Sequence, residues 1–169
     1  MTETIEVQEH GRTLAYSFED LLKYHGPGSP GGVAHAFKVM QRAFAVLAPD
    51  GPPQRREIAV RTSFGGPGAR DGFEAVTRAV SGDRYTVDPA LARPERGRLC
   101  ERFVFEVGYG ERSVTLLLRE GYVTDEFIDL ARKDGRSEAE EAHLDELKAD
   151  MAARVMGAAA SDVYDLADA

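Results

Sequence analysis

The feature that most limits how this chain folds is a run of glycine and proline over residues 25–32, HGPGSPGG. Proline lacks a backbone N–H, and glycine is poorly suited to a helix interior, so no helix continues through this run. We therefore expect two helices, a short one that begins after Ser17 and a long one from about Gly32 to Leu47. A second run, GGPG over residues 65–68, precedes a third helix near residues 69–80.

Apolar spacing predicts the remaining elements. Between Val33 and Leu47 apolar residues recur every three or four positions, which is typical of one helix face. Strands are predicted by alternation or β-branched composition at residues 58–64, 85–87, 99–107 and 114–118. The last two are expected to form a hairpin that turns at residues 108–110. Further helices are predicted after Thr124 and, from the capping box of Ser137 with Glu140, over the following residues.

This order of elements contains few β-α-β crossovers and one local hairpin. It predicts an α+β fold in which helices pack on one face of a largely antiparallel sheet. We expect residues 1–16 to form an N-terminal arm or edge strand, residues 17–155 to form one domain, and the acidic residues 156–169 to form a frayed tail.

Composition and charge exclude several classes of function. The chain has 21 Lys and Arg against 29 Asp and Glu, so its net charge of −8 opposes binding to nucleic acid. The sequence has no apolar run long enough to span a membrane, and its polar N-terminus does not resemble a signal peptide. Cys100 is the only cysteine, which excludes an internal disulfide and a cysteine zinc cluster. We expect a cytoplasmic protein of bacterial type.

Each glycine-rich loop directly precedes a helix, where free N–H groups favour an anion and glycine permits close approach. The loops match neither the P-loop nor the dinucleotide fingerprint. We predict that they bind one small polar or anionic metabolite, the alternative being that they are only tight turns. Arg61 and Arg70 are candidate clamps for a carboxylate or phosphate. The loop residues predicted to bind the ligand are Gly26, Gly28, Ser29, Gly31, Gly65, Gly66 and Gly68.

His25 is the candidate general acid or base, because imidazole titrates near neutral pH. Asp71 is expected to orient it or to receive a proton, and His35 to assist from the long helix. The alternative for each is structural: a histidine that caps a helix, a carboxylate that complements a helix dipole, and a core or surface histidine. No cofactor is expected under this hypothesis. A second hypothesis places a divalent metal on His25, His35 and Asp71.

The order of these features resembles the FmdE-like family, which is named for a component of formylmethanofuran dehydrogenase. The likeness lies in His25-Gly26 before the long helix, in Asp71 with the two residues after it, and in the aromatic strand from Phe103. The resemblance implies an FmdE-like α+β fold and a homodimer. Pro27 and Ser29 stand where the family has its second histidine and its cysteine, and Gly68 stands where it has another cysteine. The family's metal site is therefore expected to be largely absent.

Three functions follow as hypotheses. The first is an FmdE-like protein with a degenerate metal site that binds a small metabolite and carries out acid–base chemistry with His25, as a lyase, an isomerase or a condensing enzyme. The second is a non-catalytic accessory protein that assists a partner enzyme. The third is a metal-dependent enzyme with a rebuilt histidine and carboxylate site.

Overall fold

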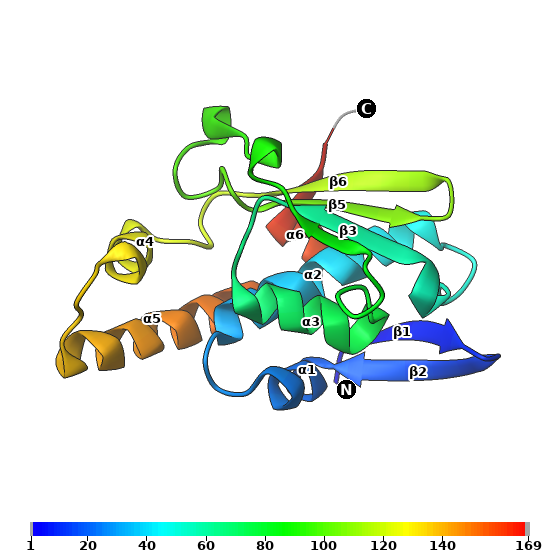
Figure 1. Cartoon of the computed structure of the whole chain (residues 1–169), viewed down its shortest axis with the longest axis horizontal. Coiled ribbons are helices and arrows are strands. Elements are labelled where there is room, and N and C mark those ends of the chain that lie inside the picture. The colour runs from blue at the N-terminus through cyan, green and yellow to red at the C-terminus, as the bar shows by residue number, and fades with distance from the viewer. Residues whose placement is uncertain (1, 168–169) are drawn as a thin grey trace.

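The computed structural model describes residues 2–167, and its elements form successive layers (Figure 1). A five-stranded sheet lies above helices α2 and α3, and helix α1 lies below them beside a separate two-stranded hairpin. This arrangement confirms the predicted α+β class, with helices packed against a largely antiparallel sheet.

The large sheet has the strand order β4-β3-β5-β6-β7. Strands β3 and β4 are parallel, whereas the other three pairings are antiparallel. Ile58, Val60 and Thr62 of β3 are buried and alternate with exposed residues, as expected for a strand with one face on the core. The strands are β3 (Ile58–Thr62), β4 (Tyr85–Val87), β5 (Val104–Tyr109), β6 (Arg112–Leu118) and β7 (Tyr164–Leu166).

Helix α2 is the centre of the molecule, because every residue from Gly31 to Met40 is buried. It packs against α3, α5 and β6. Because neighbours surround it, the faces of α2 that do not carry large apolar residues carry alanine and glycine, which permit close packing. The helices are α1 (Phe18–His25), α2 (Pro30–Leu47), α3 (Pro67–Thr77), α4 (Asp125–Arg132), α5 (Glu138–Met156) and α6 (Ala160–Val163). Short 3-10 helices cover Arg55–Glu57, Pro89–Leu91 and Pro94–Arg96.

The N-terminal segment differs from the predicted arm or edge strand. It forms a hairpin of β1 (Thr4–Glu9) and β2 (Arg12–Ser17), which pair with each other in a two-stranded sheet, and Gln8 of β1 also bridges to Gln54. His10 and Gly11 make its turn with positive φ angles of 50° and 74°. Ile5 and Val7 are buried in the main core, so the hairpin is an integral part of the fold.

The prediction of a frayed C-terminal tail is wrong for the described residues up to 167. Helix α6 leads into β7, where Tyr164 pairs with Leu118 of β6 and is fully buried. The acidic composition obscured this strand, because its buried side chains, Tyr164 and the preceding Val163, stand among aspartates, and Leu166 is only partly buried. Residues 168 and 169 of the predicted tail lie outside the described residues.

The first strand of the central hairpin is shorter than predicted, the second is longer, and the turn comes later. Strand β5 begins at Val104, since the backbone before it closes into tight turns, with Phe103 N–H donating to the carbonyl of Cys100 at 3.0 Å. Gly108 lies within β5 opposite Ser113, and the turn is made at Gly110, whose φ is +61°. Among residues 2–167, no helix has the length and apolar character that crossing a bilayer requires.

Candidate functional site

The two glycine loops meet where α2 and α3 begin, but protein atoms fill much of the space between them. A Cβ added at Gly32 would lie 2.9 Å from the backbone nitrogen of Ala69, and one added at Gly68 would lie 2.3 Å from the carbonyl oxygen of Ser29. A Cβ added at Gly31 would lie 2.2 Å from a methionine of α5. These glycines therefore let the helices approach closely, and they leave no room for a ligand at these contacts.

His25 links the first loop to α3. Its Nδ1 lies 2.8 Å from Oδ2 of Asp71, and its Nε2 accepts a hydrogen bond of 3.0 Å from the backbone N–H of Ser29. Since Nε2 accepts, the network assigns the proton to Nδ1, which donates to the Asp71 carboxylate. The His25 side chain is only 7% exposed. Both ring nitrogens are thus engaged, and the lone pair that a general base needs is already in use.

The other residues of the first loop surround this histidine. Gly26 ends α1 with a φ of +89°, and its N–H donates to the carbonyl of Leu22. The carbonyl of Gly28 accepts a hydrogen bond of 3.0 Å from Nζ of Lys148 on α5. The loop is therefore held by three helices.

His35 lies in the core rather than beside His25. It is fully buried on α2, where Nδ1 lies 2.8 Å from the hydroxyl oxygen of Tyr164, and Nε2 has no partner among the described residues. Burial lowers the pKa of His35 to about 3, so the ring is neutral at ordinary pH. Residues 2–167 contain no group of three or more His, Cys, Asp or Glu arranged to hold a metal ion, so His25, Asp71 and His35 are not assembled as one set.

The two predicted clamp residues are paired with carboxylates of the chain. Arg61 on β3 donates to Asp88 at 2.8 Å and to Glu106 at 3.4 Å. Arg70, more than half exposed, lies 3.8 Å from Oδ1 of Asp71. The structure does not bring either guanidinium into an unpaired position.

Gly65 and Gly66 of the second loop line a cavity of about 370 Å³ that also reaches α4. Nothing lies within 4 Å of a Cβ added at Gly65, so the backbone there faces open space. The other lining residues are aromatic, small apolar or cationic: Phe64, Phe103, Phe127, Ile128, Ala131, Arg98, Arg102 and Arg132.

The three arginines of this cavity differ in their partners. Arg98 donates to Asp125 at 2.8 Å and to Asp129 at 2.7 Å, and is therefore neutralised by α4. Arg102 and Arg132 are exposed, and their guanidinium groups form no ion pair and no hydrogen bond within the described part of the chain. The sequence analysis did not identify Arg102 or Arg132. The one local signal for Arg102 is that it stands four residues after Arg98 and next to Phe103.

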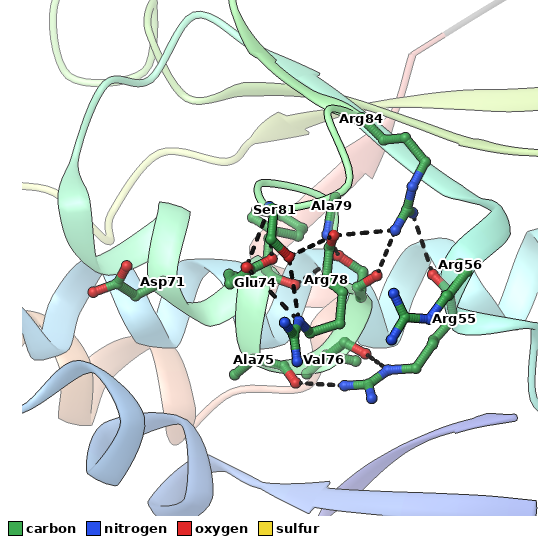
Figure 2. A network of polar contacts seen from close by, with 12 residues as sticks. Arg55, Arg56, Asp71, Glu74, Ala75, Val76, Arg78, Ala79, Ser81 and Arg84 are labelled. Carbon is green, nitrogen blue, oxygen red and sulfur yellow. Dashed lines mark hydrogen bonds and ion pairs between the residues drawn. The ribbon is translucent and has the colours of Figure 1, made fainter. Parts of the chain in front are cut away.

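At the C-terminal end of α3, in contrast, the arginines are paired with backbone carbonyls (Figure 2). Arg55 is 7% exposed and donates to the carbonyls of Ala75 and Val76, each at 2.9 Å. It also donates to Glu9 at 3.0 Å and to the hydroxyl of Tyr16 at 2.9 Å, which ties the N-terminal hairpin to the helix.

Arg84 completes the cap at this end. Its guanidinium donates to the carbonyl of Thr77 at 3.0 Å, to that of Arg78 at 3.1 Å and to that of Arg55 at 3.4 Å (Figure 2). It also donates to the carbonyl of Ile58. The last carbonyls of a helix lack partners within the helix, and here side-chain cations supply them. These arginines are therefore structural.

No family model matches this chain, and no curated protein matches it. The resemblance to the FmdE-like family stays a prediction.

Proposed function

We propose that this protein binds a small anionic organic molecule in the cavity at the second glycine loop. The observation that carries the proposal is the pair of arginines, Arg102 and Arg132, which line one cavity and lack partners among residues 2–167 in a chain whose net charge is −8. The volume of about 370 Å³ lies within the range of small-molecule sites.

The chemistry of the lining supports an anion. A guanidinium presents a planar fork of donors that matches a carboxylate or a phosphate, and both of these arginines line the same cavity. Acidic side chains outnumber basic ones in this chain, yet none pairs with Arg102 or Arg132 among residues 2–167. The open backbone at Gly65 leaves room beside them.

Acid–base chemistry at His25 is not part of this proposal, because the Nε2 of His25 already accepts the Ser29 N–H. That role, the partner enzyme and the homodimer stay predictions.

A thermal-shift screen of small organic anions tests the proposal. We expect at least one anion to raise the Tm of the wild-type protein, and to lose this effect in the double variant Arg102→Gln/Arg132→Gln. Arg12→Gln is the matched control, since Arg12 is exposed on the β1–β2 hairpin at the opposite end of the molecule from α4 (Figure 1). The proposal fails if no anion raises the Tm, or if the double variant responds as the wild type does.

A further inference from the structure

The apolar wall of the cavity is mostly aromatic, and its rings form a series. Phe64 stacks on Phe103 with a centroid distance of 4.5 Å and an interplanar angle of 24°. Phe103 in turn lies 4.7 Å from the ring of the buried His35. Phe64, at the outer end of the series, is only partly buried, and so is Phe127 on α4. A planar ring in the cavity would extend this series in the offset arrangement that aromatic pairs favour.

The outer ring is held in place before any ligand arrives. A Cβ added at Gly66 would lie 2.5 Å from the ring carbons of Phe64, so the glycine backbone rests against that ring. The backbone N–H of Phe64 donates to the Thr62 hydroxyl at 3.0 Å, and Thr62 is itself fully buried. A fixed platform loses little conformational entropy on binding, which favours affinity for a rigid planar partner.

The arginines do not cover these rings. Among residues 2–167, the single cation–π contact is between Arg55 and Tyr16. The guanidinium carbon of Arg55 lies 5.6 Å from the centroid of the Tyr16 ring. Arg102 precedes β5 and Arg132 ends α4, so they approach the cavity from two elements. The cavity therefore combines aromatic side chains in its lining with two guanidinium groups that have no partner in the described part of the chain.

We infer that the ligand is an aromatic carboxylate, with its ring against Phe64 and Phe127 and its carboxylate between Arg102 and Arg132. This inference rests on the proposed binding function and adds the chemical class of the ligand. A purely aliphatic acid satisfies the arginines but not the aromatic platform, and a neutral aromatic compound satisfies only the platform.

Three probes separate these requirements in a calorimetric titration: naphthoate, its fully saturated counterpart decalin carboxylate, and the neutral naphthalene methanol. We expect naphthoate to bind about threefold to tenfold more tightly than decalin carboxylate, the range that aromatic pairing contributes beyond area burial. Phe127→Leu keeps an apolar side chain of helix-compatible shape but removes the ring. It should weaken naphthoate by a similar factor and leave decalin carboxylate unchanged.

The outcomes distinguish the class of ligand from the binding function itself. Equal affinity of naphthoate and decalin carboxylate would overturn the aromatic inference and leave anion binding standing. Equal affinity of naphthoate and naphthalene methanol would overturn the role of the carboxylate. Failure of all three to bind would overturn the aromatic inference, and the proposed function would fall with it only if no small anion raised the Tm in the thermal-shift screen. The probe series on the wild-type protein decides these cases even if Phe127→Leu does not fold.

Discussion

The two ends of helix α3 present arginines in opposite states. At the C-terminal end, Arg55 and Arg84 donate to the carbonyls that the helix leaves unpaired, and Arg55 is almost completely buried. At the N-terminal end, the glycine loop opens onto a cavity where Arg102 and Arg132 have no partner among residues 2–167.

This difference separates arginines that hold the fold from arginines available to a ligand. A buried guanidinium whose donors all meet acceptors stabilises the protein, and its loss leaves several carbonyls unsatisfied. An exposed guanidinium without a partner contributes little to folding, and its donors stay available to a ligand. Substitutions at the two ends of α3 should therefore affect different properties of the protein.

The largest effect is expected for Arg55→Met. The change removes donors to Ala75, Val76, Glu9 and Tyr16 at once, and leaves polar groups of a closely packed region unpaired. We expect the free energy of unfolding in urea to fall by about 3 kcal/mol. Arg12→Met is the control, and a loss no larger than that of the control would contradict the structural role of Arg55.

The pH dependence of stability tests the histidine beneath the cavity. His35 has a folded-state pKa of about 3, whereas an unfolded histidine has the ordinary pKa of 6.5. The unfolded state therefore binds the proton first, and stability falls as pH falls from about 6.5 toward 3, by about 1.4 kcal/mol per pH unit. Between about pH 6 and pH 5, His35→Gln should lower the slope of the unfolding free energy against pH by about 1.4 kcal/mol per pH unit, which corresponds to the uptake of one proton on unfolding. An unchanged slope would show that His35 is protonated in the folded protein.

An intermediate effect is expected for His25→Ala. It removes the hydrogen bonds to Asp71 and to the Ser29 N–H, and should destabilise the protein by about 2 kcal/mol in urea unfolding. Asp71→Asn keeps an acceptor oxygen for Nδ1 and should cost less, about 1 kcal/mol. If both variants were as stable as the wild type, the cross-link between α1 and α3 would not be a structural one.

The smallest effect on stability is expected at the cavity. Arg102→Gln and Arg132→Gln should each change the free energy of unfolding by less than about 0.5 kcal/mol, because neither side chain pairs within residues 2–167. The same variants should lose the anion-dependent rise in Tm. A loss of stability comparable to that of Arg55→Met would remove the distinction between the two ends of α3.

Local signals in the sequence predicted much of the fold. The helix face from Val33 to Leu47, the helix start after Ser17, the capping box of Ser137, and the glycine runs that end or precede helices all occur in the structure. These features depend on residues that are close together in the sequence, so a local pattern is enough to predict them. Strand β7 could not be predicted in this way, because its three residues become a strand only when β6 lies beside them.

The candidate site was less accessible to sequence reasoning. Arg61 carries the same local chemistry as Arg102 and Arg132, and only the fold places the carboxylates of Asp88 and Glu106 beside it. The glycines of the two loops also differ in their surroundings. Gly32 and Gly68 face protein atoms, whereas Gly65 faces open space. Partners in space, rather than residue types, decide these roles.

The contact between His35 and Tyr164 joins residues 129 positions apart. Such a long-range contact closes a large loop and forms late, since the entropy of closure must be overcome first. During synthesis, α2 cannot acquire this partner, nor β6 its neighbour β7, until residue 166 has emerged. Leu116 and Leu118 therefore lack their β7 partners from the time they are synthesised until residue 166 has emerged, and this edge of the sheet stays open for that part of translation.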